Sequence, residues 1–441
     1  MAGATIRSLT ALLLGAGILI LGQGLMLALV PQAMNAMAFS VQAVSFVGAA
    51  YFAGFFAGAW RGEAIMHSVG HVRTYAGLIA LIIVSVLALP FFDSPWIWFA
   101  LRFLHGFAAG GAFLTIEAWM NGAADTNNRG RVLASYMVVT LGGLGISQFL
   151  ASAGDVTSLT PVVIGGILFA ASIIPVVLTR IDAPQLEKTA SLPLGDVYKN
   201  SPFGFVIVFA VGMCQGAFWA IGPFFAAEAA TISVSTVMAL AVFAGLLYQW
   251  PTGYFSDKID RRLLVAVITA VVSIAAIVAF LIMSAGGAWM IYVFFIVLGA
   301  QFCLYPVAMA HAVSQAPDRN ASLGVARGLI MAVGLGQTVG PLVAGPFVSF
   351  IQPAGLLVYF AVLFGGMTFY SYRRMNIGAQ VVPGEQQPFV FTRMTTPIGA
   401  EIDPRTADSP PIEGSGDLST DEEAPRQSDP SEENMRAGGT G

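Results

Sequence analysis

Apolar residues run through this chain in long uncharged stretches that short polar and charged connections separate. One stretch extends from Ile232 to Phe255 and the next from Leu263 to Met283, with a tight charged segment between them. A helix needs about 20 apolar residues to cross a bilayer, so each stretch predicts a membrane-spanning helix. The pattern predicts twelve of them, at residues 9–31, 42–60, 75–92, 96–119, 132–151, 161–179, 202–222, 234–254, 263–284, 289–311, 325–346 and 354–372.

The charges between the stretches predict how the helices are oriented. Lys and Arg favour the cytoplasmic side, and the first stretch, Leu9–Val30, is long enough to be a membrane helix, unlike the short core of a signal peptide. With the N-terminus inside, the inner connections hold the Lys and Arg of the loops. The outer connections hold only the acids Asp93, Asp155 and Glu228. An even number of helices then places both termini in the cytoplasm.

Composition agrees with an all-α membrane protein. Hydrophobic residues make up 56% of the 441 positions and charged residues 10%, against about 25% charged in a soluble domain. The 49 glycines suit close helix–helix approach in lipid. Because the sequence has no metal-ligand spacing, nucleotide-binding motif or nucleic-acid patch, we expect no cofactor, metal or nucleic-acid partner, and the partners are a solute and the lipid bilayer.

The chain also repeats itself. Glu117 and Gly142 precede His311 and Gly336 by 194 residues, and Gly58 precedes Gly253 by 195. This spacing predicts an N-terminal six-helix bundle at 1–180, a linker at 181–201 and a C-terminal six-helix bundle at 202–372. Transporters built from paired halves hold their solute near mid-membrane between the halves.

Residues 373–441 differ from the rest of the chain. They carry twelve of its 24 acids and no apolar periodicity. Such a segment buries too little apolar surface to offset the entropy of ordering, so we expect a disordered, acidic cytoplasmic tail. A plain solvated tail is the favoured interpretation, and a regulatory or partner-binding role is the alternative.

The charged segment at 253–262 reads G-x-x-x-D-K-x-D-R-R and resembles the conserved loop of the major facilitator superfamily. Arg102 with Gly106 resembles the R-x-x-x-G motif of its fourth helix, and Glu117 followed by Arg129-Gly130-Arg131 is similar to the acid and Arg-Gly pair at that helix end. Leu304-Tyr305-Pro306, Met309–Ala312, Gln249-Trp250-Pro251 and Gly340–Gly345 resemble a YcaD-like bacterial subgroup.

This resemblance implies two pseudo-symmetric six-helix bundles in the bacterial cytoplasmic membrane. It also implies a monomeric secondary active transporter that moves a small organic solute by alternating access. An anionic solute and proton coupling are candidates. Helix five lacks the Gly-Pro motif of the family's drug–proton antiporters, so the direction of transport stays open. The alternative is a non-transporting membrane sensor that signals through its tail, and we do not expect an enzyme.

The resemblance further implies that Asp257 lies near the start of helix five in the other half. An anion at a helix N-terminus is stabilised, so Asp257 would latch the halves together on the cytoplasmic side. The first-half counterpart, from Gly58 to Arg73, has Arg61 near the acid's place and Glu63 displaced, so we expect unequal latches. Residues that only enforce topology are the alternative. The predicted cytoplasmic gate comprises Arg61, Glu117, Arg129, Asp257, Arg261, Arg262, His311 and Arg327.

Polar groups inside the predicted spans are the candidates for a solute site, because an ionisable group there costs free energy unless it is paired or hydrated. Arg102 is a candidate anion site and His105 a candidate proton carrier, against structural roles for both. The predicted cavity residues are Gln23, Arg102, His105, Gln215, Trp219, Gln301 and Tyr305. Small residues at close-packing spacings predict helix contacts at Gly54, Gly58, Gly106, Gly253, Gly336 and Gly340.

Overall fold

The computed structural model describes residues 2–123, 129–152, 154–178, 193–228, 233–316, 319–351, 353–377, 389–390 and 396–397. Its helices are α1 (Ala2–Ala36), α2 (Val41–Val69), α3 (His71–Ala88), the short 3-10 helix η1 (Leu89–Phe91), α4 (Pro95–Ala123), α5 (Arg129–Leu150), α6 (Leu159–Leu178), α7 (Leu194–Asn200), α8 (Pro202–Glu228), α9 (Val234–Ser256), α10 (Arg261–Ser284), α11 (Met290–Leu298), α12 (Gln301–Val313), α13 (Arg319–Ile351) and α14 (Gly355–Met375).

Twelve of the helical segments are long and apolar enough to cross a membrane, and they match the twelve predicted stretches one for one. Most helices extend a few residues beyond the predicted ranges, and two connections differ from the prediction. The expected first-half loop at 58–73 is mostly helical, because α2 continues to Val69 and only Gly70, with φ +85°, interrupts the chain before α3. The predicted linker at 181–201 contains the short helix α7, and the rest of it up to residue 192 lies outside the described residues.

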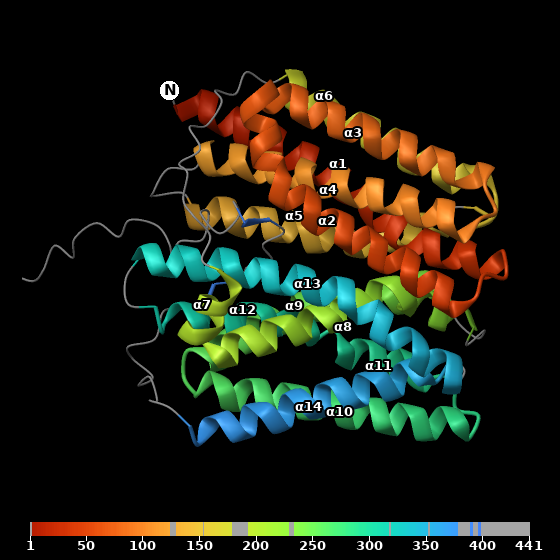
Figure 1. Ribbon diagram of the computed structural model, residues 1–441, viewed down its shortest axis with the longest axis vertical. Helices are drawn as coiled ribbons and strands as arrows, with labels where there is room; N and C mark the ends of the chain where they lie inside the picture. Colours follow the sequence, from red (N-terminus) through yellow and green to blue (C-terminus); the bar gives the residue numbers. More distant parts are fainter. Residues whose placement is uncertain are drawn as a thin grey trace, which may run out of the picture. The chain divides into compact units, whose positions relative to one another are not determined.

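The helices α1–α6 form one bundle and α7–α14 form a second, drawn in red to yellow and in green to blue in Figure 1. The tenth membrane segment is divided between α11 and α12 at Gly299-Ala300. There α9 approaches so closely that a Cβ at Gly299 would contact the carbonyl oxygen of Ala241. The fold class is therefore the predicted one, twelve membrane helices in two six-helix bundles.

Glycines set the closest helix crossing in the first bundle. A Cβ at Gly54 or Gly58 of α2 would overlap the carbonyl of Phe103 or Phe107 on α4, and a Cβ at Gly106 would overlap the carbonyl of Tyr51 on α2. Small residues allow such backbone contact between membrane helices. In the second bundle Gly336 and Gly340 of α13 play the same part against α8.

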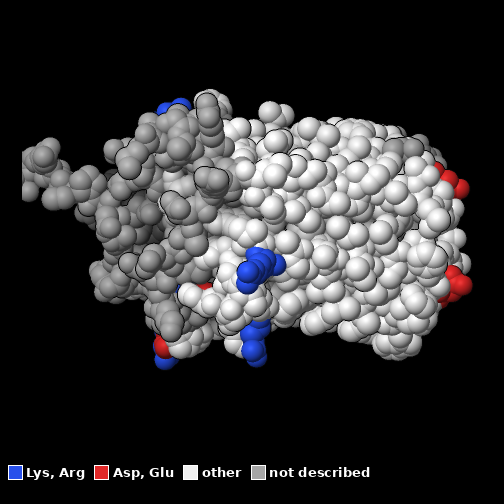
Figure 2. Space-filling view, turned by 90° about the horizontal axis from the view of Figure 1, so that it is seen from above, with Lys and Arg blue, Asp and Glu red and all other residues white. Residues whose placement is uncertain are grey.

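Charge differs between the two ends of the helices. On the face shown in Figure 2, the end marked by acidic side chains carries no Lys or Arg. We call the end that holds Arg61, Asp257 and Lys258 the inner end, following the predicted orientation, and the end that holds Asp93 and Asp155 the outer end.

The two bundles meet at the outer end. Gln42 at the start of α2 donates a 2.6 Å hydrogen bond to the hydroxyl of Ser349 near the end of α13. Ser152, just beyond α5, is hydrogen-bonded to Ser235 at the start of α9. A Cβ at Gly48 of α2 would overlap the Ala220 side chain on α8. Polar and steric contacts thus close this end between the halves.

Most of the predicted tail at 373–441 lies outside the described residues, but its first residues extend α14 to Met375, and Phe389, Val390, Thr396 and Pro397 are described further along the chain. Thr396 is completely buried, and Phe389, Val390 and Pro397 are half-buried against the helices. Composition alone gave no sign of these contacts, which lie at the inner end.

Candidate functional site

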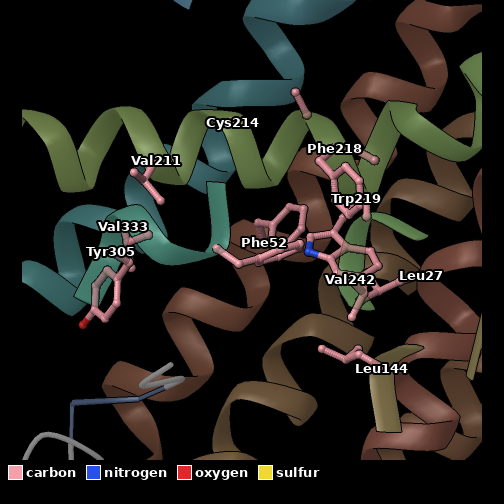
Figure 3. Packing of buried hydrophobic residues seen from close by; sticks show 14 of the residues in the cluster. Leu27, Phe52, Leu144, Val211, Cys214, Phe218, Trp219, Val242, Tyr305 and Val333 are labelled. Atoms are coloured by element: carbon pink, nitrogen blue, oxygen red, sulfur yellow. The ribbon is translucent and has the colours of Figure 1, made fainter. Parts of the chain in front are cut away.

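A cavity of about 100 Å³ lies between the bundles, near the middle of the membrane-spanning helices. Its wall is mostly aromatic and aliphatic. In Figure 3, Trp219 of α8 lies close to Phe52 of α2 and Leu27 of α1, with Leu144 of α5 opposite. The polar side chains of the described wall are uncharged: Gln23, Tyr51, Thr140, Gln215, Gln249, Tyr305 and Gln337.

Four of the predicted cavity residues, Gln23, Gln215, Trp219 and Tyr305, line this cavity. The other three are elsewhere. Gln301 is fully buried and accepts a 3.0 Å hydrogen bond from the Cys214 thiol. Arg102 and His105 lie behind Tyr51 and Gln23, outside the described cavity wall, because hydrogen bonds hold them there.

A chain of hydrogen bonds holds Arg102 and His105 in the first bundle. An Arg102 terminal nitrogen lies 2.8 Å from His105 Nδ1, and His105 Nε2 lies 3.2 Å from the Gln23 side-chain oxygen. Because arginine only donates, Nδ1 accepts and the proton sits on Nε2, so the imidazole is neutral in this arrangement. The Gln23 amide in turn donates to the Tyr51 hydroxyl at 2.5 Å.

Arg102 also packs on an aromatic ring, with its guanidinium carbon 4.4 Å from the centre of the Tyr51 ring. It borders a second cavity of about 10 Å³ that shares Tyr51 and Trp219 with the large one. That volume is close to the minimum for a single water molecule. Arg102 therefore braces Tyr51 and His105 in this conformation and has no room beside it for an organic anion.

Two buried polar atoms in the wall of the large cavity have no hydrogen-bond partner in the described structure. They are the indole N–H of Trp219 and the side-chain oxygen of Gln249. The Gln249 amide nitrogen is already used, because it donates to the carbonyl of Phe302 at 3.0 Å. A buried polar group without a partner costs free energy, so these two atoms are suited to bind a solute.

Tyr51, Gln249 and Gln337 were not among the predicted cavity residues. Gln337 of α13 donates to the Gln215 side-chain oxygen at 3.2 Å, which links two amides of the wall. All three positions carry polar groups within apolar stretches, and that signal is visible in the sequence. What the sequence did not indicate was the face of each helix that meets the cavity.

At the inner end, Glu117 is completely buried. One carboxylate oxygen accepts a 3.1 Å hydrogen bond from the Tyr136 hydroxyl, and the other accepts from the backbone N–H (3.1 Å) and the hydroxyl of Thr396. Arg61, a predicted gate partner, is exposed and lies over the Trp60 ring. Arg73, a second predicted partner, is also exposed, and the side chain of the third, Arg129, lies outside the described residues.

The charged loop after α9 ties helices of the second bundle together. Arg262 is paired with Asp260, with a shortest distance of 2.8 Å, and donates to the carbonyl of Arg374 at the end of α14. Burial alone would raise the pKa of Asp260, but the hydrogen bonds and charge of Arg262 outweigh it, and the pKa lies below the ordinary value. Arg261 is buried and donates to the hydroxyls of Ser256 and Ser314, both at 3.1 Å.

Asp257 keeps a half-exposed carboxylate. It lies 3.5 Å from Arg261 and accepts a 2.8 Å hydrogen bond from the backbone N–H of Phe389. The contact of Asp257 with the start of α5 stays a prediction, and it applies to a conformation in which the inner end is closed.

Two further predicted gate residues lie in the second bundle. His311 packs edge-on against Phe203, with ring centres 4.8 Å apart, and Arg327 is buried on α13. Gly253 was expected to pack helices, but the atoms nearest to a Cβ there belong to the Phe389 ring.

Comparison with known proteins places the fold. The family model of the Major Facilitator Superfamily matches residues 12–341. An uncharacterized MFS-type transporter YcaD from Salmonella arizonae is 29% identical over 341 residues, which is 76% of this chain and 87% of the relative. The corresponding YcaD of Salmonella newport is 29% identical over 304 residues, 68% of this chain and 78% of the relative.

Solved transporter structures share the fold at low sequence identity. A mutant of the nucleoside transporter NupG superposes with a TM-score of 0.70 at 15% identity, covering 83% of this chain and 99% of NupG. A D-xylose-proton symporter superposes with a TM-score of 0.66 at 15% identity, covering 86% and 99%. The chain therefore belongs to the major facilitator superfamily of transporters and resembles its YcaD-type members.

Proposed function

We propose that this protein is a secondary transporter that moves a small uncharged organic solute across the bacterial cytoplasmic membrane, with both termini in the cytoplasm. The observation that carries the proposal is the mid-membrane cavity between the two bundles. Transporters built from paired repeats bind their solute at this place and expose it to each side by rocking one half against the other. The contacts that close the outer end fit one of the two conformations of such a cycle.

The chemistry of the wall supports an uncharged, amphiphilic solute. Aromatic side chains such as Trp219 and Phe302 offer faces for a planar or apolar body. The Trp219 N–H offers a donor and the Gln249 oxygen an acceptor. A solute with one acceptor and one donor on an apolar frame would satisfy both, whereas the described wall offers no charge to an ionic solute.

The position of Arg102 argues against the anionic solute considered from the sequence, because its guanidinium is engaged by His105 and the Tyr51 ring. Proton coupling needs a group that changes charge during the cycle. Glu117 is the only buried acid among the described residues, so it is the candidate for that role.

Replacing Trp219 by Phe should weaken solute binding while keeping the ring. We expect affinity to fall about three- to tenfold, because a neutral hydrogen bond contributes roughly 0.5–1.5 kcal/mol. The measurement is a thermal-stability screen of the purified protein with uncharged and anionic solutes, followed by titration of those that stabilise it. The exposed Trp289→Phe is the matched control. Stabilisation by anions that Arg102→Lys abolishes would contradict the proposal.

A membrane sensor that signals through its C-terminal region is the second candidate function. The observation that favours it is Pro397, a residue of that region that forms part of the cavity wall. A solute entering the cavity would displace it. Transport by a chain ending at residue 388, reconstituted in proteoliposomes, would rule out the sensor.

A further inference from the structure

The C-terminal region beyond α14 returns to the inner end of the helices at two points. Phe389 meets the second bundle and Thr396 meets the first, and Pro397 follows directly into the wall of the central cavity. No role for these residues was predicted from the sequence. Each contact uses a carboxylate that the sequence had assigned to the cytoplasmic gate.

At the first point, Phe389 is held by backbone and ring. Its N–H donates to the Asp257 carboxylate at 2.8 Å. Its ring lies against Gly253 near the end of α9, where a Cβ would come within 2.8 Å of the ring. Because glycine has no side chain, the helix surface here is open to an aromatic ring. The hydrogen bond to Asp257 and the ring contact with Gly253 together form a small binding site for Phe389.

At the second point, Thr396 is completely buried and both its donors reach the same acceptor. Its backbone N–H and its hydroxyl donate to one oxygen of Glu117, while Tyr136 of α5 donates to the other. Hydrogen bonds to an ionised group are about twice as strong as neutral ones. Glu117 is a buried acid on α4 in the first bundle, so Thr396 supplies polar partners that a buried carboxylate requires.

We propose that the inner mouth is a binding site for the chain's own segment around Phe389–Pro397, and that the bound segment inhibits transport; the inhibition rests on the proposed transporter function. The segment bridges Asp257 in one half and Glu117 in the other. It must leave before the inner end closes, and Pro397 stands in the path between the cavity and the inner side. The ligand class of this site is a peptide with an aromatic residue and, seven positions later, a Thr-Pro pair.

Truncation separates this segment from the rest of the C-terminal region. A chain ending at residue 388 lacks both contacts, and a chain ending at residue 407 keeps them. Each carries Phe56→Cys, a half-buried cavity position, as the reporter, since the native Cys214 and Cys303 are buried. The measurement is the rate of labelling by a membrane-impermeant maleimide from the inner side in inside-out vesicles.

We expect the chain ending at 388 to be labelled at least about tenfold faster than the full chain and the chain ending at 407, because a tethered segment has an effective concentration near millimolar at its site. Within the full chain, Thr396→Glu should accelerate labelling by repelling Glu117, and Thr396→Ser, which keeps both donors, should not. A synthetic peptide of residues 386–400 should slow labelling of the short chain again, and a scrambled peptide should not.

Equal labelling rates in the two truncated chains, or in Thr396→Glu and Thr396→Ser, would overturn the binding site. Because labelling requires no solute, this result is independent of transport. If labelling accelerates as expected but solute uptake by the short chain does not exceed that of the full chain, the segment binds without inhibiting. If neither chain moves any solute that binds the cavity, the proposed function fails and the binding site stands.

Discussion

A disulfide between positions 152 and 235 should stop transport. The Ser152 and Ser235 hydroxyls are hydrogen-bonded across the two halves at the outer end, so cysteines at these positions can bring their sulfurs to the bonding distance of about 2.05 Å. Once this end is covalently closed, the halves cannot rock to expose the cavity outward. In proteoliposomes, we expect uptake by the oxidised Ser152→Cys/Ser235→Cys protein to fall to the level of protein-free liposomes.

The reversal and the single variants are the controls. A reducing agent should restore uptake, and Ser152→Cys or Ser235→Cys alone should behave like the wild type under oxidation. The native cysteines are buried on α8 and α12 and serve as an internal check. Uptake that continues unchanged after quantitative cross-linking would mean that the outer end does not open in the cycle.

Replacing Gly106 by Leu should prevent the first bundle from forming. A Cβ there overlaps the carbonyl oxygen of Tyr51, which belongs to the backbone of α2 and cannot rotate away. Overpacking a core typically costs about 1–3 kcal/mol, and a clash with backbone lies at or above the upper end of that range. We expect most of the variant to be lost as aggregate, measured by size-exclusion chromatography in detergent.

Gly77 on α3 provides the matched control, because a Cβ there meets nothing within 4 Å. Gly77→Leu should be recovered at the wild-type level with a similar melting temperature. Equal recovery of Gly106→Leu and Gly77→Leu would show that the close crossing of α2 and α4 is not required for folding.

The helices were predictable from the sequence because membrane crossing depends on the local length of an apolar run. The continuation of α2 to Val69 was not, because hydropathy carries no information once a helix leaves the bilayer. The glycine at position 70 was the available signal, because glycine readily adopts a positive φ, here +85°, that other residues rarely adopt.

The cavity was predictable only in part. Depth along a helix follows from the sequence, and Gln23 and Trp219, two of the predicted cavity residues, lie in the cavity wall. The face of a helix that is apolar all round does not follow, because such a helix has no amphipathic direction. For that reason the sequence could not indicate that Arg102 and His105, at a suitable depth on α4, lie behind the cavity wall. It could not indicate either that Tyr51 lines the cavity.

The returning segment could not be predicted from composition, because Phe389 and Thr396 lie in a polar region without periodicity. The partners they found, Asp257 and Glu117, were both recognised from their motifs as belonging to the inner end. Their assignment to a gate between the halves therefore stays a prediction, and in this structure their described contacts include the C-terminal segment.

The most direct test of alternating access measures whether the central cavity opens to the outside. Leu27→Cys on α1, which lines the cavity, is introduced into the Ser152→Cys/Ser235→Cys protein. Labelling by a membrane-impermeant maleimide is then followed from the outer side of right-side-out vesicles. We predict that Leu27→Cys is protected after oxidation and that, after reduction with a reagent that is removed before labelling, the protein takes up more label than the reduced Ser152→Cys/Ser235→Cys protein without Leu27→Cys. Outer-side labelling of Leu27→Cys in the oxidised protein, or no label beyond that of the reduced double-cysteine protein, would contradict the account.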